Sequence, residues 1–347
     1  MEGINMRDFV GFKKGVNLGG WLSQCDYSEN TLENFITEDD IKRIAGWGAD
    51  HVRLPFDFNI IINENGEMKP DAFKYLDRAV SWTKKHGINI ILDLHKTLGF
   101  SFDPGEKEAG FFSNEKYQDI FVNMWVKIAE HFSGNDKNIA FELLNEITDD
   151  EFAEPWNKIS RCAIEAVRKV APHNYIIIGG IHNNSIKGLS LMEKPADDKI
   201  VFTFHFYDPL IFTHQKAYWV DGMPADFDMA YPAPTAEYVE KSKKFPEKKV
   251  WEVFEGYAED VVDARFLEFY MREAVCIAEK MNTPLYCGEY GVIEIAPLPD
   301  TLRWHKDMRD VFNRLNIGHS VWVYKALDFG FMDDARRDIY DELTKLI

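Results

Sequence analysis

The feature that most constrains the fold is a regular alternation of short apolar runs with longer amphipathic stretches along the 347 residues. A buried strand followed by an amphipathic helix is the repeating unit of a parallel sheet. Several runs are apolar on both faces, as expected of strands buried between an inner core and outer helices. Eight such runs occur, at residues 15–19, 51–55, 88–95, 139–146, 175–180, 200–206, 284–291 and 319–324.

Amphipathic helices are predicted between these runs. In residues 71–87, Phe73, Leu76 and Val80 recur at helical spacing, and Gly87 is a typical helix end. The same reasoning predicts helices over residues 114–132, 155–170, 261–281, 300–315 and 334–346. Eight strand–helix units favour a (β/α)₈ TIM barrel, with residues 1–347 as a single domain. A Rossmann fold is disfavoured because the first run, GVNLGGW, is not the phosphate-binding G-x-G-x-x-G motif.

One connection is much longer than the others. Residues 206–258, after the sixth predicted strand, are rich in aromatic residues, contain the basic run KSKKFPEKK and follow no single period. A connection of this length in a compact domain is usually functional. We therefore predict an insertion subdomain at the active face of the barrel, with Trp219 or Trp251 lining the cleft.

Composition excludes several classes of partner. The formal net charge of -18 repels phosphate backbones and anionic membranes, so we expect no nucleic-acid and no membrane partner. The four cysteines form no C-x-x-C pair or Cys/His cluster, so no metal site is indicated. The first residues lack the pattern of a secretory signal, which predicts a cytoplasmic protein, or a secreted one if a signal has been removed. A monomer is the default expectation.

Polar residues gather at the ends of the predicted strands, which in a barrel face the mouth where catalytic groups lie. Two of them, Glu146 and Glu289, end the fourth and seventh strands. Both side chains would point toward the barrel axis, within reach of the roughly 5–5.5 Å separation that retaining glycoside cleavage uses. Either carboxylate alone could instead form a salt bridge at the barrel mouth. The other candidates are Arg53, His95, Asn145, His205, Tyr207 and Trp322.

The surroundings of the two glutamates suggest different roles. A carboxyl in a partly apolar setting beside a second carboxylate stays protonated more readily, so Glu146 suits a general acid. A cation such as Arg53, and a hydroxyl from Tyr207 or Tyr290, could keep Glu289 ionised as a nucleophile.

The remaining candidates have two interpretations each. His95 and His205 could bind sugar hydroxyls or be ordinary core histidines. Trp322 offers a ring for a sugar face but would bury a similar area as core.

A set of motifs spanning nearly the whole chain resembles glycoside hydrolase family 5, and within it the bacterial endoglucanases of the cellulase type. The motifs are GVNLGGW (15–21), HVRLP (51–55), LDLH (92–95), FELLNE (141–146), HFYDP (205–209), CGEYG (287–291) and VWVY (321–324). LNE alone is a weak signal, but the ordered set is specific.

The resemblance implies a retaining β-glycosidase without a cofactor, acting on a β-1,4-glucan polysaccharide or oligosaccharide. It assigns Glu146 as acid/base, Glu289 as nucleophile and Asn145 as a ligand of the sugar 2-hydroxyl. Trp322 matches the family's sugar platform before the cleaved bond, and the other matching active-site positions are Arg53, His95, His205 and Tyr207. Asn17, in the first predicted strand, lies where a member of the family can contact sugar.

One position departs from the pattern, because Lys96 stands where many cellulases of the family carry a second histidine. This leaves open a different β-glycan, such as mannan, xylan or xyloglucan, or exo-acting β-glucanase activity. Two other classes also remain as alternatives. One is a non-catalytic sugar-binding barrel, and the other is a metal-dependent hydrolase using Asp93, His95, Glu146 and His205 as ligands.

Overall fold

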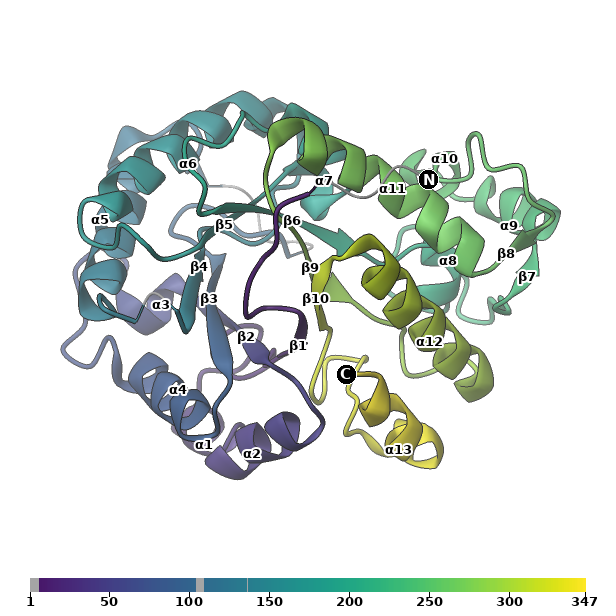
Figure 1. Ribbon diagram of the computed structural model, residues 1–347, viewed down its shortest axis with the longest axis horizontal. Helices are drawn as coiled ribbons and strands as arrows, with labels where there is room; N and C mark the ends of the chain where they lie inside the picture. Colours follow the sequence, from purple (N-terminus) through teal and green to yellow (C-terminus); the bar gives the residue numbers. More distant parts are fainter. Residues whose placement is uncertain (1–5, 104–108, 136) are drawn as a thin grey trace.

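The structure is a computed structural model that describes residues 6–103, 109–135 and 137–347. Eight parallel strands close into a barrel in the order β1-β10-β9-β6-β5-β4-β3-β2 (Figure 1). Each of the eight predicted runs overlaps one of these strands, so the predicted TIM barrel is confirmed. The barrel strands are β1 (Lys14–Asn17), β2 (His51–Asp57), β3 (Asn89–Lys96), β4 (Ile139–Glu142), β5 (Ile176–Gly179), β6 (Ile200–Phe206), β9 (Leu285–Tyr290) and β10 (Gly318–Val321).

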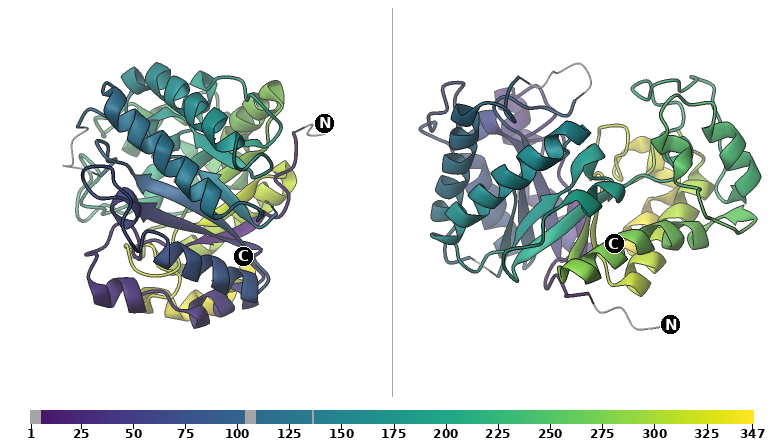
Figure 2. Two further views of the ribbon diagram at one scale, coloured as in Figure 1. Left: turned by 90° about the vertical axis from the view of Figure 1, so that its left-hand side faces the viewer. Right: turned by 90° about the horizontal axis from the view of Figure 1, so that it is seen from above.

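Helices cover the outside of the barrel (Figures 1 and 2). The longer ones are α2 (Glu38–Gly46), α4 (Lys74–Lys85), α5 (Glu115–His131), α6 (Ala153–Arg168), α11 (Ala264–Met281) and α12 (Leu298–Leu315). Short helices are α1 (Glu29–Asn34), α3 (Phe58–Ile61), α7 (Ile181–Asn184), α8 (Leu210–Thr213), α9 (Thr235–Ser242), α10 (Lys249–Glu252) and α13 (Tyr340–Leu343). Single 3₁₀ turns lie at Asp150–Phe152, Lys187–Leu191, Asp334–Ile339 and Thr344–Leu346.

Five of the six predicted helices are present within a few residues of their predicted ends. In α4, Leu76, Ala79 and Thr83 form the buried face. The periodic signal works here because one stripe of a helix covers the sheet while the rest meets solvent. The sixth prediction, residues 334–346, was wrong as a continuous helix. That segment is α13 between two 3₁₀ turns, which tighten the ends of short helices.

The two ends of the barrel interior differ in polarity. At the amino-terminal end, Phe9 and Phe12 close the barrel against a separate apolar cluster of inward-facing residues. Those residues are Ile91, Ala140, Ile177, Val201 and Tyr286. Two positions further along β3 and β4 the inward residues are Asp93 and Glu142, both fully buried. The packed apolar layer therefore restricts the chemistry to the carboxyl end of the barrel.

A β-bulge in β9 sets the direction of Glu289. Along the β6–β9 ladder, Phe204 pairs with Cys287, but the next residue, His205, pairs with Glu289. The extra residue is Gly288, where an added Cβ would lie 2.9 Å from the Thr203 hydroxyl. A bulge shifts the alternation of side chains by one. Glu289 consequently faces the interior together with His205.

The segment between β6 and α11 contains α8, α9, α10 and a small antiparallel pair, β7 (Ala233–Pro234) with β8 (Val261–Val262). Figures 1 and 2 show these elements gathered at one side of the barrel. Many of its aromatic residues are buried within the core, such as Phe212, Tyr231 and Tyr238. Part of the aromatic content of residues 206–258 therefore belongs to the hydrophobic core.

None of the helices within the described residues combines the length and apolarity that crossing a membrane requires.

Candidate active site

A cavity of about 630 Å³ lies where the carboxyl ends of the barrel strands meet the segment after β6. Of the predicted site residues, His95, Asn145, Glu146, His205, Tyr207, Glu289 and Trp322 line it. The segment after β6 contributes Trp219, Lys249, Val250 and Val253, among others. Trp219 is thus a lining residue as predicted. Trp251 is not among the residues that line this cavity.

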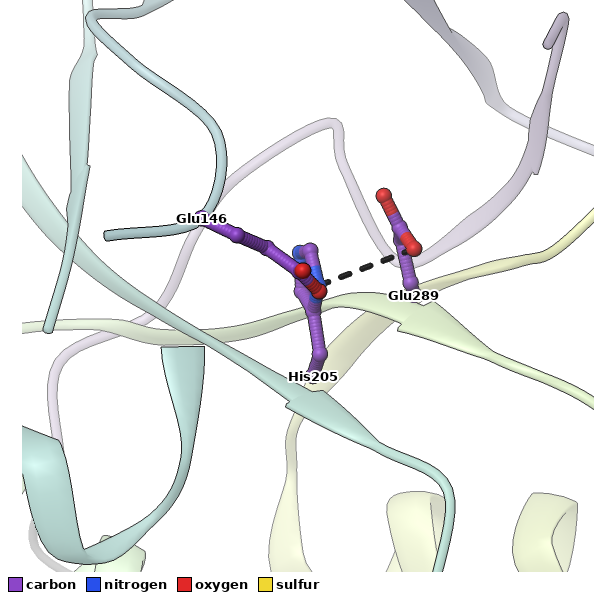
Figure 3. Close-up of side chains that lie close together, drawn as sticks. All are labelled: Glu146, His205 and Glu289. Atoms are coloured by element: carbon purple, nitrogen blue, oxygen red, sulfur yellow. Dashed lines mark hydrogen bonds and ion pairs between the residues drawn. The ribbon is translucent and has the colours of Figure 1, made fainter. Parts of the chain in front are cut away.

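Glu146 and Glu289 approach each other across the cavity (Figure 3). One carboxylate oxygen of each, together with a ring nitrogen of His205, lies within 4.8 Å of the others. Glu289 belongs to β9, whereas Glu146 lies four residues beyond the end of β4 in the following loop. The predicted fourth strand was therefore too long at its end, although Glu146 does line the cavity as predicted.

Both oxygens of Glu289 accept a hydrogen bond. Nη1 of Arg53 lies 2.8 Å from Oε1, and the Tyr207 hydroxyl donates to Oε2 at 2.9 Å. Burial and the neighbouring glutamates raise the pKa of Tyr207 well above its ordinary value, so the phenol keeps its proton and acts as a donor. The other tyrosine considered, Tyr290, packs its ring against Phe312 instead. These two contacts orient the carboxylate.

Glu146 is also held through both oxygens. Nδ1 of His205 lies 2.7 Å from Oε1, and the Asn183 amide donates to Oε2 at 2.9 Å. Burial raises the pKa of Glu146, while the bond from Asn183 acts in the opposite direction. The net raised pKa agrees with the expectation that Glu146 retains a proton more readily than an exposed glutamate.

Arg53 is the centre of the polar network and is fully buried. Its guanidinium makes a two-pronged pair with Glu142, at 2.7 and 2.9 Å, and lies 3.0 Å from Asp93. It also donates to Asn145 at 2.8 Å. Burial alone would lower the pKa of Arg53, but the three surrounding carboxylates raise it well above the ordinary value. One permanent cation therefore organises the carboxylates beneath the cavity.

His95 is fixed by its neighbours. Its Nδ1 lies 2.6 Å from Asp93, and its ring stacks on Trp322 with 5.8 Å between ring centroids and 4° between planes. Because the Asn145 oxygen accepts from Arg53, the Asn145 amide nitrogen faces Nε2 of His95 at 3.5 Å. Burial lowers the pKa of both His95 and His205 to about 4, so both rings are neutral near pH 7.

Two predicted site residues lie beneath the cavity rather than on its wall. Asn17 and Arg53 are fully buried and are absent from the lining. The Asn17 amide donates to Gly288 and Ser320, and its oxygen accepts from Arg53. The structure therefore places Asn17 as a support for the bulge in β9, and the predicted sugar contact of Asn17 is not supported.

Lys96, which departs from the family's pattern, has an acidic partner nearby. Lys96 forms an ion pair with Asp103, and Asp103 lines the cavity. The side chain that replaces the second histidine thus reaches the site through an acidic neighbour.

A metal site of the kind considered above would need a different set of residues. Among residues 6–103, 109–135 and 137–347, one group of His, Cys, Asp or Glu side chains has ligand atoms within 4.8 Å of one another, namely Glu146, His205 and Glu289. Asp93 and His95 are outside this group and bond to each other. The four ligands of the metal hypothesis are therefore not brought together.

The sequence reasoning missed Glu142, Asn183 and Asn184, and considered Asp93 only as a metal ligand. Glu142 could have been found by counting alternate positions along the fourth strand, because it faces inward two residues after Ala140. Asn183 and Asn184 follow the fifth strand in the run GGIHNN. The rule that polar residues after barrel strands face the mouth applied to them, but that strand end was left without a candidate.

A (β/α)₈ barrel with two glutamates facing each other at the carboxyl end of its strands has the architecture of a glycosidase. The family profile described as Cellulase (glycosyl hydrolase family 5) matches residues 13–328. The chain belongs to this family and is a glycoside hydrolase.

Named relatives and solved structures agree with this membership. Cellodextrinase A of Ruminococcus flavefaciens is 43% identical over 322 residues, which cover 92% of this chain and 88% of the relative. Endoglucanase C of Acetivibrio thermocellus is 36% identical over 342 residues, covering 97% and 98%. The structure of Thermotoga maritima Cel5A in complex with cellobiose superposes with a TM-score of 0.73 at 21% identity, over 97% of each chain. That similarity confirms the fold.

Proposed function

We propose that this protein is a retaining hydrolase of β-1,4-glucosidic bonds in cellulose-related glucans or their oligosaccharides. The observation that carries the proposal is the approach of Glu146 and Glu289 to within 4.8 Å. Retaining enzymes hold their two carboxyl groups about 5–5.5 Å apart, whereas inverting enzymes need roughly 6.5–9.5 Å for a water molecule. The names of the relatives, a cellodextrinase and an endoglucanase, support the choice of substrate.

The mechanism has two displacements. Glu289 attacks the anomeric carbon while Glu146 transfers its proton to the leaving glycosidic oxygen, which yields a glycosyl-enzyme ester and a free alcohol. Glu146, now a carboxylate, takes a proton from water, and the hydroxide oxygen attacks the anomeric carbon to release Glu289. The raised pKa of Glu146 suits the first step.

The neighbouring residues position these groups. The Tyr207 hydroxyl and Arg53 orient the Glu289 carboxylate toward the cavity. Asn145 lines the cavity, and because Arg53 engages its oxygen, its amide nitrogen lies beside Nε2 of His95 at 3.5 Å. A donor at this position suits a sugar hydroxyl beside the reacting carbon. Trp322 presents a ring surface, backed by His95, on which a sugar ring can stack.

We further propose that residues 206–258 form an insertion subdomain within a single catalytic domain and act as one wall of the substrate cleft. Trp219 and the segment around Lys249 line the same cavity as the two glutamates. A wall of this kind shortens the cleft, which favours oligosaccharides of a few sugar units over long, crystalline chains.

Azide rescue tests the two roles separately. Glu289→Ala and Glu146→Ala should each lose at least about a thousandfold in activity on cellotetraose, because each removes a covalent or proton-transfer step. With an activated aryl β-cellobioside and azide, Glu289→Ala should yield the α-cellobiosyl azide and Glu146→Ala the β-cellobiosyl azide. Glu237, a partly exposed residue of α9 outside the cavity lining, serves as a control, and Glu237→Gln should have normal activity.

Identical azide products from the two alanine variants would contradict the assignment, as would full activity of Glu289→Ala. Retention is checked by proton NMR of the first sugar released from cellotetraose, which should be the β-anomer. The substrate is checked on β-1,4-glucan, mixed-linkage glucan, mannan and xylan. Faster cleavage of mannan or xylan than of glucan would overturn the choice of β-1,4-glucan.

A further inference from the structure

The residues that follow β5 form a left-handed turn. His182, Asn183 and Asn184 have φ values of 56°, 55° and 55°. Residues other than glycine rarely adopt this conformation, and asparagine tolerates it better than most. Three in succession persist only where the surrounding structure imposes them, and such strained segments cluster at functional sites.

Three close approaches of glycine residues impose the turn. A Cβ on Gly180 would lie 2.5 Å from the carbonyl carbon of Gly188, and a Cβ on Gly188 would lie 2.3 Å from the oxygen of Ile181. At Gly179 a Cβ would lie 2.0 Å from the Asn184 side chain. No larger residue fits at these three positions without moving the turn.

The turn is attached to the loop that carries Glu146 at three points. The Asn183 side-chain amide donates to Oε2 of Glu146 at 2.9 Å, and the Asn183 backbone amide donates to the oxygen of Ile147 at 2.8 Å. His182 pairs with Asp150 at 2.6 Å. The Asn145 backbone amide still donates to the oxygen of Leu94 in β3 at 2.9 Å. From Glu146 onward the three contacts with the turn hold the loop in place.

The next residue supports the other oxygen of Glu146. The Asn184 amide nitrogen lies 3.3 Å from Nε2 of His205, and Nδ1 of the same ring lies 2.7 Å from Oε1 of Glu146. Two consecutive asparagines therefore hold both carboxyl oxygens, one directly and one through the imidazole.

We propose that Asn183 is a positioning residue for the acid/base Glu146, and that the left-handed turn exists to present it. This inference rests on the proposed function. Asn183 acts through Glu146, fixing the plane of its carboxyl group toward the leaving oxygen. The hydrogen bond that Asn183 donates stabilises the ionised form of Glu146 and so lowers its pKa. Asn183 thereby helps to set the pH above which Glu146 loses the proton that it needs as a general acid.

The test compares Asn183→Gly with Asn282→Gly. Glycine adopts positive φ without strain, so Asn183→Gly removes the amide and keeps the turn. Asn282 is a matched control, because it ends α11 with φ 53° and does not line the cavity. The readout is kcat/KM against pH for phenyl β-cellobioside, which needs protonation of its leaving group, and for 2,4-dinitrophenyl β-cellobioside, which does not.

For Asn183→Gly we expect kcat/KM on the phenyl substrate to fall about tenfold, a part of the 10²–10⁴-fold that general acid catalysis supplies. The alkaline limb of its profile should move up by about half to one pH unit, because the ionised carboxyl loses a donor. The dinitrophenyl substrate should change less than about threefold, and Asn282→Gly should match the wild type on both. Asn183→Asp, which places a carboxylate beside Glu146, should move the limb further upward.

A profile of Asn183→Gly that coincides with the wild type, or an equal loss on both substrates, would overturn the positioning role. The proposed function fails in a different way. If the wild type cleaves neither aryl cellobioside, or if Glu146→Gln retains full activity on the phenyl substrate, the acid/base assignment is wrong whatever Asn183→Gly does.

Discussion

The Arg53–Glu142 pair offers a sharp test of how the buried network supports the site. Glu142→Gln keeps the shape of the side chain but replaces one acceptor oxygen by an amide nitrogen, which faces the guanidinium donor to donor. Both partners are completely buried, and the two bonds measure 2.7 and 2.9 Å. Solvent cannot replace the lost contact.

The size of the effect follows from the remaining partners of Arg53. Breaking a buried pair costs about 3–5 kcal/mol when the remaining charge is left alone. Here Asp93 stays at 3.0 Å and Glu289 at 2.8 Å from the guanidinium, so the cation keeps two carboxylates. The expected loss of stability is therefore that of one charge-assisted hydrogen bond, about 1.5–3 kcal/mol. Part of this loss is offset, because burying an amide costs less free energy than burying a carboxylate.

We therefore expect Glu142→Gln to lower the free energy of unfolding by about 2 kcal/mol, measured by urea denaturation. For a chain of this length that corresponds to a fall in Tm of about 3 °C. Since the same guanidinium orients Glu289, kcat/KM on an aryl cellobioside should fall about tenfold, equivalent to 1.4 kcal/mol. Glu237→Gln, which removes a partly exposed surface pair with Lys241 on α9, should change the unfolding free energy by less than about 0.5 kcal/mol.

Two results would refute this reasoning. Stability of Glu142→Gln equal to that of the wild type would mean that the buried pair contributes nothing net. Reduced stability with unchanged kcat/KM would mean that Glu142 does not act on Glu289 through Arg53.

Three further predictions concern the cavity. Trp219→Ala should raise KM for cellotetraose about fivefold through a lost stacking surface, while Trp251→Ala, outside the cavity lining, should not; equal effects would argue against a wall formed by Trp219. Exhaustive chelation should leave the rate of hydrolysis unchanged, because two carboxyl groups suffice for the mechanism, and a loss restored by a divalent cation would contradict it. Burial raises the pKa of Asp208 to about 7, above its value in the unfolded chain. The ionised carboxylate is therefore disfavoured in the folded protein, which destabilises the fold above the folded pKa and has no effect below the unfolded pKa. Asp208→Asn should therefore stabilise the protein against urea at pH 8 but not at pH 4, and a gain that is the same at both pH values would count against the buried charge.

Much of the fold could be predicted from local pattern. Strands buried on both faces and helices with one apolar stripe each leave a periodic signature, which is why all eight barrel strands were located. The fifth strand–helix unit deviates, because the short α7 and the 3₁₀ helix Lys187–Leu191 follow β5 instead of a long helix. The glycines of GGIHNNSIKG (179–188) are required by close contacts across the turn, and such contacts leave no periodic signal in the sequence.

The candidate site was predicted in part for the same reason. The two glutamates were found because residues after barrel strands meet at one end of the barrel. Their neighbours were harder to predict, since Glu142 and Asp93 are close to Arg53 only after three strands have been placed side by side. The choice between Tyr207 and Tyr290 likewise depended on the tertiary structure. The Tyr207 hydroxyl reaches Glu289, whereas the Tyr290 ring packs against Phe312.

The sequence by itself determined the order of strands and helices, the barrel, and the position of two glutamates at its carboxyl end, because these depend on local hydrophobic period and on motif. Only the tertiary structure decided the direction of Glu289, which faces inward because of the bulge at Gly288 in β9. It alone also revealed the left-handed turn that brings Asn183 to Glu146. The bulge lies between β6 and β9, which are far apart in the chain, and the turn reaches Glu146 only when β4 and β5 lie side by side. These contacts exist only once the barrel has formed.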